Sequence, residues 1–148
     1  MDPAYDVNLL PRILLSLVTV GYGIGLIVAD LNRTHATNPD WTGHARFHVV
    51  WQVLSYTGFA AIALYLIWMP AADWLGRFYL AAGFAVVIFV SFFLALMFRA
   101  GYRGTIYDPN GVQPMVLGGM RVDTNIFVFC VFIVLLLGAL LTVSPGPV

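Results

Sequence analysis

The sequence has 148 residues, of which 61% are hydrophobic and 9% are charged, and its formal net charge is zero. Soluble domains carry about 25% charged residues, so this composition excludes an ordinary soluble domain, and the lack of a basic excess argues against nucleic acid as a partner. The charged residues are seven arginines and seven aspartates. Without lysine there is no Schiff-base chemistry, and a single cysteine, Cys130, excludes disulfide scaffolds and thiolate metal clusters within the chain.

Four apolar stretches predict four helices, at about residues 9–29, 39–69, 77–98 and 124–143. About 20 apolar residues suffice to cross a bilayer, and backbone groups in lipid must bond within the protein. We therefore expect an all-α integral membrane protein, with residues 1–148 forming a single four-helix transmembrane domain. The acidic N-terminal segment lacks the basic region of a signal peptide, so we expect the first helix to be retained.

The arginines predict the orientation of the chain. Five of the seven lie in the loops 30–46 and 99–123, which four crossings place on the same side. The positive-inside rule then makes these loops cytoplasmic, with both termini outside the inner membrane of the cell. The same loops hold nine of the 14 charged residues, and all three histidines lie between positions 35 and 48. We therefore expect the chemistry of the protein at this membrane face.

Polar residues at helical spacing follow the first loop. Asn38 before Pro39 predicts the start of the second helix. A helix from that point carries one polar stripe into the apolar zone, at Asp40, His44, His48 and Gln52. Two histidines one turn apart can share a metal, and His35 could join them from the loop. The alternative is an interfacial stripe that only hydrogen-bonds to neighbouring helices, although polar groups at membrane depth favour a functional role.

Further polar residues flank this segment. Asp30 ends the first helix, where the helix dipole disfavours a carboxylate, so we expect an arginine or a metal beside it. In the second loop, Tyr102, Arg103 and Tyr107 could close over a pocket, and the apolar stretch 113–120 could fold back as a lid. The alternative is an ordinary interfacial loop, with Asp30 in a surface ion pair of little energetic value.

The segment Trp41-Thr-Gly-His44-Ala-Arg-Phe-His48 resembles the entry to helix two of bacterial styrene oxide isomerases, which are also small four-helix membrane proteins. This resemblance implies haem b held by His44 or His48, a ferric iron that opens an epoxide as a Lewis acid, and a trimeric assembly. The segment also resembles small membrane proteins with the pattern Thr-His-x-x-Asn-Pro-x-Trp-x-x-His-Ala-x-Phe-His, which implies no particular reaction.

The leading hypothesis is a membrane-embedded enzyme, an isomerase acting on a small lipophilic substrate near the cytoplasmic face. His44 and His48, with Gln52 or His35 beside them, would hold haem b or a divalent metal, or would act as acid and base without a cofactor. The carboxylates of Asp30 and Asp40 would orient the histidines. The groups that would stabilise developing negative charge on oxygen are Arg46, Arg103, Tyr102 and Tyr107.

Other functions remain open for the same residues. A non-catalytic subunit could hold a pigment, haem or quinone within a larger membrane complex. A terpenoid or epoxide cyclase or hydrolase could use histidine and aspartate as acid and base. A small transporter is less favoured because no charge lies in the middle of several helices. The expected partners are membrane lipid, a lipophilic substrate, and either further copies of this chain or a larger membrane complex.

Overall fold

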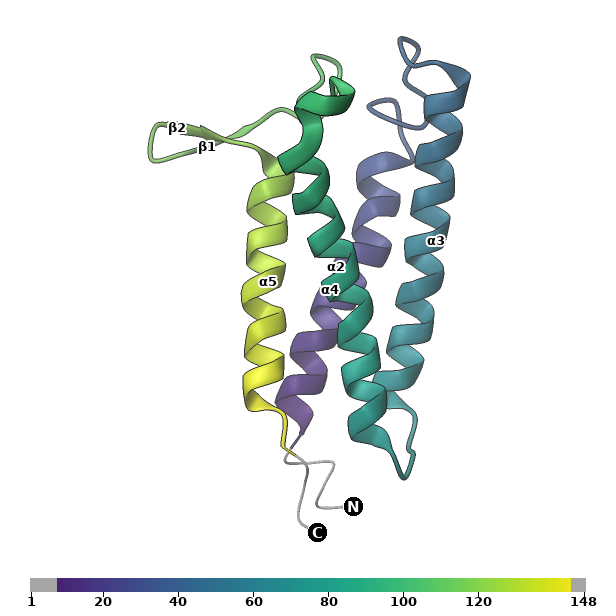
Figure 1. The fold of residues 1–148 in the computed structure, drawn as a ribbon, viewed down its shortest axis with the longest axis vertical. Helices are drawn as coiled ribbons and strands as arrows, with labels where there is room; N and C mark the ends of the chain where they lie inside the picture. The colour runs from purple at the N-terminus through teal and green to yellow at the C-terminus, as the bar shows by residue number, and fades with distance from the viewer. Residues whose placement is uncertain (1–7, 145–148) are drawn as a thin grey trace.

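The computed structural model describes residues 8–144 as four long helices with a small β-hairpin at one end (Figure 1). In chain order the elements are α2 (Leu9–Asp30), α3 (Gly43–Trp68), α4 (Trp74–Phe98), the 3₁₀ helix η1 (Arg99–Tyr102), β1 (Met115–Leu117), β2 (Met120–Val122) and α5 (Thr124–Thr142). All four α-helices are long and apolar enough to cross a membrane, which confirms the predicted all-α four-helix class. The acidic segment before α2 lies outside the described residues.

The predicted start of the second helix at Asn38 and Pro39 is wrong. α3 begins at Gly43, and Thr42 is its N-cap. The Thr42 hydroxyl accepts a hydrogen bond from the amide of Ala45 at 3.2 Å, which satisfies one of the free donors of the first turn. A threonine at this position therefore displaces the helix start to a point beyond the Asn-Pro pair.

Asn38 does not cap a helix because its side chain is used inside the loop. It is fully buried, its Nδ2 donates to the carbonyl of Thr34 at 3.1 Å, and its Oδ1 accepts from the amide of Asp40 at 3.0 Å. This is the local turn chemistry that asparagine also favours. As a result Asp40 lies in the loop, and it does not continue the helical stripe that contains His44.

Aspartates cap the third and fourth long helices. Asp73 accepts from the amide of Gly76 at 3.2 Å, so α4 begins at Trp74, a few residues earlier than predicted. Asp123 accepts from the first-turn amides of α5, including that of Asn125 at 2.9 Å. A carboxylate at a helix N-terminus also interacts favourably with the helix dipole, so these caps define where each span starts.

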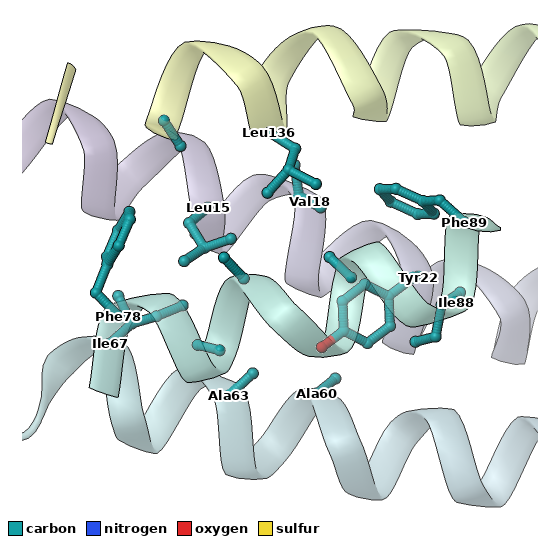
Figure 2. Packing of buried hydrophobic residues seen from close by; sticks show 14 residues of the cluster. Leu15, Val18, Tyr22, Ala60, Ala63, Ile67, Phe78, Ile88, Phe89 and Leu136 are labelled. Atoms are coloured by element: carbon teal, nitrogen blue, oxygen red, sulfur yellow. The ribbon is translucent and has the colours of Figure 1, made fainter. Parts of the chain in front are cut away.

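The core extends from the end of the bundle at the 69–73 turn to just beyond the middle of the helices, where Tyr22 and Phe89 lie (Figure 2). Six of its fourteen buried residues are alanines, which let the helices approach closely. The members are Leu15, Val18, Tyr22, Ala60, Ala63, Ile67, Phe78, Ala81, Ala82, Ala85, Ile88, Phe89, Leu136 and Ala139. In the half nearer the polar loops, Val53 is the one other fully buried apolar side chain among the described residues. The bundle is therefore tightly packed at one end and more open at the other.

The close approach of α2 and α3 at Gly23 gives a test of this packing. A methyl group on Gly23 would overlap the side chain of Ala60, whereas one on Gly25 would meet nothing within 4 Å. We expect Gly23→Ala to destabilise the bundle by about 1–3 kcal/mol, the usual cost of overpacking. Gly25→Ala is the matched control and should stabilise α2 slightly, because alanine favours the helix by about 1 kcal/mol.

Thermal unfolding in detergent, followed by circular dichroism, measures both variants. A Gly23→Ala protein that melts at or above the temperature of Gly25→Ala would contradict the described contact between α2 and α3.

Candidate functional site

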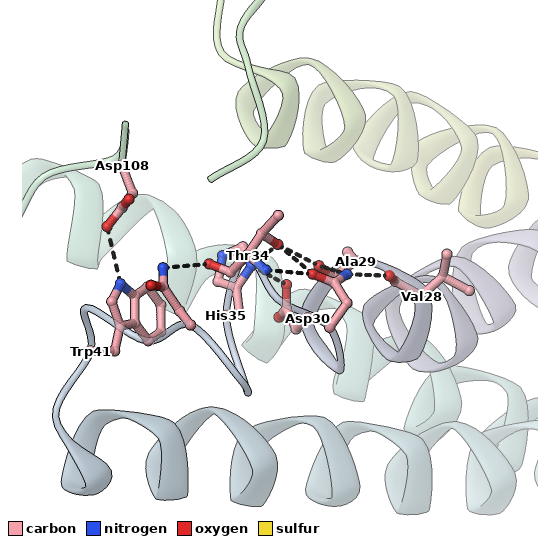
Figure 3. Close-up of polar contacts among 9 residues, drawn as sticks. Val28, Ala29, Asp30, Thr34, His35, Trp41 and Asp108 are labelled. Atoms are coloured by element: carbon pink, nitrogen blue, oxygen red, sulfur yellow. Dashed lines mark hydrogen bonds and ion pairs between the residues drawn. The ribbon is translucent and has the colours of Figure 1, made fainter. Parts of the chain in front are cut away.

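The two polar loops meet at one end of the bundle, as the sequence predicts. The indole Nε1 of Trp41, in the first loop, donates to Oδ2 of Asp108, in the second, at 3.0 Å (Figure 3). Nearby, the side-chain amide of Asn110 donates to the carboxylate of Asp40. These two contacts join segments about 70 residues apart in the chain and hold the second loop over the first.

The first loop is organised by the side chain of Asn32. Its Nδ2 donates to the carbonyls of Val28 and Ala29, both at 2.8 Å, which satisfies free acceptors at the end of α2. Its Oδ1 accepts from the amide and the hydroxyl of Thr34, each at 2.7 Å. Asn32 thus turns the chain back toward α2 and fixes the position of the residue that follows Thr34.

That residue is His35, which lies beside Asp30. Nδ1 of His35 is 2.8 Å from the Thr34 hydroxyl and 3.7 Å from Oδ1 of Asp30. The expected arginine or metal partner for Asp30 is therefore replaced by a histidine from the same loop. The reason is local, since the amide of Ala36 bonds to the carbonyl of Asp30 at 2.9 Å and brings position 35 back over the helix end.

His35 and Trp41 form one wall of a cavity between the loops, here called the loop cavity. Their rings meet edge to face with centroids 5.2 Å apart. The cavity measures about 170 Å³ and is lined by His35, Trp41, Thr105, Ile106, Tyr107, Asp108, Gly111, Val112 and Asn125. Thr105 and Ile106 also line an adjoining hollow of about 120 Å³, which extends down α4 past Tyr102 and Arg99. The loop cavity thus combines a histidine, a carboxylate and a phenol with the apolar side chains of Ile106 and Val112.

Asp108 is held in its ionised form by the same contacts. The hydrogen bond from Trp41 lowers the pKa of Asp108, and the amide of Asn110, which donates to Oδ1 at 2.8 Å, lowers this pKa further. Hydrogen bonds that favour the charged form of a carboxyl have this effect. The cavity therefore carries a fixed negative charge at its edge.

A second group of polar residues lies on the outside of α3. Nε2 of His44 and Nε2 of His48 are 3.0 Å apart, and both side chains are exposed. Gln52 is exposed on the next turn, and a shallow hollow of about 290 Å³ is lined by His48, Trp51, Gln52, Ser55 and Tyr56. We call His44, Phe47, His48, Trp51 and Gln52 the histidine face of α3. It faces away from the loop cavity residues of its own chain, none of which line this hollow.

The sequence-predicted ligand set of His35, His44 and His48 is not brought together. Across residues 8–144, no three histidine, cysteine, aspartate or glutamate side chains are grouped as a metal site. The hollow beside His48 is lined by residues of α3.

The remaining predicted residues divide between cavity and surface. Tyr107 lines the loop cavity, and its hydroxyl donates to Oε1 of Gln113 at 3.2 Å. Tyr102 lines the adjoining hollow and donates to the carbonyl of Ala95 at 2.8 Å. Arg46 and Arg103 are not among the lining residues, so the expected stabilisation of negative charge by these two arginines is not supported by the cavity.

The stretch 113–120 is not a lid. It belongs to the antiparallel hairpin of β1 and β2, which extends sideways from the top of α5 (Figure 1). Gly118 and Gly119 both have positive φ, of 55° and 83°, and form the two-residue turn. Gly-Gly between short apolar strands is a hairpin signal, so the sequence favours this hairpin over the expected lid. The pairing of Trp41 with Asp108 has no local signal in the sequence.

A larger hollow than the loop cavity lies elsewhere. A groove of about 340 Å³ runs between α4 and α5, and its lining side chains, such as Phe93, Met97 and Leu140, are all apolar. Without a polar group this groove supplies no acid, base or ligand, and in a bilayer it faces lipid tails.

Comparison with known proteins identifies the family of the chain. The profile of a family of unknown function, DUF6640, matches residues 14–120, and the chain belongs to that family. The match includes the first loop, the histidine face and most of the second loop. No curated protein and no solved structure matches the chain.

The contact between Trp41 and Asp108 gives a test of the closed loop arrangement. We expect Asp108→Ala to free the second loop, because it removes the acceptor for both Trp41 and the amide of Asn110. Hydrogen–deuterium exchange should become severalfold faster over residues 105–112. Trp41→Phe should reproduce the effect, whereas Arg103→Ala, an exposed change in the same loop, should not. Unchanged exchange in the first two variants would show that the loops are held by other contacts.

The pKa of Asp108 gives a pH dependence of known sign. Its folded-state pKa lies below the usual value of about 3.9, so its contribution to stability is present above that pH and is lost as pH falls through the folded-state pKa. We expect the loops to stay closed from pH 8 to about pH 4 and to open only in stronger acid. Carbon-13 NMR of the aspartate carboxyls measures this, and Trp41→Phe should raise the pKa of Asp108. A pKa that is unchanged in that variant would contradict the assigned cause.

Proposed function

We propose that this family member is a membrane-embedded isomerase that rearranges a small lipophilic substrate by acid–base chemistry in the loop cavity. The observation that carries the proposal is the placement of His35, which is fixed by Thr34 and Asp30 and lines a cavity that also contains apolar side chains. A histidine held through Nδ1 keeps its other ring nitrogen, Nε2, for exchange of a proton with a substrate.

The chemistry suits an internal rearrangement. An isomerisation of this kind needs a group that gives a proton to the substrate and later takes it back, and no co-substrate is required. His35 would donate a proton to the epoxide oxygen as the bond from that oxygen to the carbocation-forming carbon breaks. A 1,2-shift of hydride from the neighbouring carbon to the cation then gives a protonated carbonyl, and His35 would recover the proton from that oxygen. Asp30 lies next to the imidazole, where it would interact favourably with the ring whenever the ring holds the proton.

The charge of the cavity favours substrates that develop positive charge on carbon. Its edge carries the ionised Asp108, and the lining residues include no arginine. A carboxylate stabilises a carbocation-like centre and repels an oxyanion, in contrast with the oxyanion stabilisation by arginine that the sequence suggests. Ring opening of an aryl or allylic epoxide develops positive charge of this kind. Ile106, Val112 and the Trp41 ring would contact the hydrocarbon part of such a substrate.

The proposal places the loop cavity at the cytoplasmic face of the inner membrane. The supporting observation is the distribution of arginine, because five of the seven lie at this end of the bundle. A lipophilic substrate that partitions into the bilayer would reach the loops from the headgroup region, so the cavity lies where such a molecule is concentrated.

Turnover of a small epoxide tests the proposal. Purified protein in liposomes would be incubated with styrene oxide and with an allylic epoxide, and the carbonyl isomer would be measured by gas chromatography. We expect product from the wild type and a loss of about 10²–10⁴-fold in kcat for His35→Ala, the usual contribution of a general acid or base. The kcat of Asp30→Asn should lie between those of the wild type and of His35→Ala.

His44→Ala is the matched control, because it removes a histidine from the outer surface of α3. It should retain the wild-type rate. If turnover survives in His35→Ala but is lost in both His44→Ala and His48→Ala, the reaction takes place at the histidine face and not in the loop cavity. A wild-type protein that is inactive on both epoxides would overturn the proposal for this substrate class.

A further inference from the structure

The histidine face of α3 presents an arrangement that the loop cavity does not use. His44 and His48 lie at the start of the spanning helix, and Gln52 follows them toward the apolar zone. All three side chains are exposed in the single chain. Polar groups at or near membrane depth are costly when they face hydrocarbon, so they normally face another protein, water or a bound group.

The two imidazoles lie close to the separation of two ligands on one metal ion. Their Nε2 atoms are 3.0 Å apart, and the rings stand nearly perpendicular, at 82°. Zinc–nitrogen bonds measure about 2.0–2.1 Å, so two ligands of a tetrahedral ion lie about 3.3 Å from one another, and a shift of a few tenths of an ångström would bring the two nitrogens to that distance. A direct hydrogen bond between the rings would use the same two atoms, but it would satisfy only that one pair and would leave the rest of the face uncovered.

One chain does not complete such a site. Among residues 8–144 no third histidine, cysteine, aspartate or glutamate joins the pair. Structural zinc takes four protein ligands. In a twofold-symmetric dimer each copy presents the same surface, so two copies facing each other across α3 would supply four imidazoles.

The surroundings of the pair suit contact with a second copy. Phe47 is 64% exposed and Trp51 is 59% exposed, and each ring lies with its centroid 5.9 Å from that of His48. Aromatic residues at the centre of an interface contribute strongly to binding once they are covered. The Gln52 amide can hydrogen-bond to its counterpart, as amides do between helices in membranes. The charge of Arg46 lies two positions from each histidine, and residues two apart on a helix do not face each other.

We propose that His44 and His48 bind a divalent transition-metal ion of the zinc type, shared between two copies of this chain that pack through their α3 helices. The site goes beyond the proposed isomerisation and does not depend on it, because His35 and the loop cavity belong to a different part of the fold. Its role is assembly, since the metal would link the two chains at the membrane surface.

Metal titration tests the site. Purified protein in detergent would be stripped with a chelator and titrated with Zn²⁺ against a chromogenic competitor. We expect one Zn²⁺ for every two chains with a Kd of about 1 μM or tighter. His44→Ala and His48→Ala should each weaken binding by more than the roughly 100-fold that loss of an outer-sphere partner costs. His35→Ala is the matched control, and it should bind like the wild type.

Mass and geometry provide the second measurement. Light scattering should show dimers with Zn²⁺ that revert to smaller species with chelator, and His48→Ala should show no metal-dependent change. Co²⁺ in place of Zn²⁺ should give the intense visible absorption of a tetrahedral ion. Four results would each overturn the shared site. They are a stoichiometry of one metal per chain, an affinity in the millimolar range (an adventitious ion only), a loss of Zn²⁺ affinity in His35→Ala equal to that in the other two variants, and a mass that is insensitive to metal.

Discussion

Backbone amides and carbonyls cannot remain unpaired in hydrocarbon, and this constraint underlies the rest of the structure. It forces each apolar stretch into a helix. Backbone groups without a partner inside a helix therefore occur at the helix ends, where other groups must bind them. At those ends Thr42, Asp73 and Asp123 cap three N-termini, and the side chain of Asn32 binds two carbonyls at the end of α2. The polar chemistry of the chain is therefore concentrated where helices start and stop.

The two ends of the bundle satisfy this constraint differently. Near the 69–73 turn, alanines allow close helix contact and the interior is filled by side chains such as Leu15 and Phe78. Near the loops, chain segments are joined by side-chain hydrogen bonds such as that between Trp41 and Asp108. A side-chain hydrogen bond also supports the packed end, where Nε1 of Trp68 donates to Oγ of Ser16 at 2.8 Å. The loop end contains the loop cavity, which is lined by a histidine and a carboxylate.

The fold class and the end of the bundle that holds most of the polar residues could be predicted from the sequence, because both follow from local composition. Apolar length predicts the spans, and the clustering of histidine and charge predicts the polar end. Helix spacing also correctly places His44, His48 and Gln52 in one helix. These patterns depend on residues close together in the chain, which is why they can be read without a structure.

The predictions from sequence were wrong or incomplete where two residues could play the same local role, or where the residues in contact are far apart in the chain. Asn38 and Thr42 are both good capping residues, and only tertiary burial of Asn38 decides in favour of Thr42. The neighbour of Asp30 depends on how a short loop turns back, which charge arguments alone do not determine. Asp108 and Trp41 are 67 residues apart, so no spacing rule connects them. The sequence thus predicts which segments form the candidate site, whereas the structure is needed to identify the individual residues that line it.

The central position of α2 has a consequence for how the chain matures. This first helix packs against both α3 and α5, whereas α4 and α5 touch each other little except through phenylalanine pairs such as Phe92 and Phe129. During synthesis α2 leaves the ribosome before α3 and α4, and its partner α5 follows them. Until α5 has been made, the side of α2 that packs against it, including Val18, lacks this protein neighbour. The contacts between α2 and α5 can therefore form only after α3 and α4 have been synthesised, and a chain that stops before α5 would leave this side of α2 uncovered.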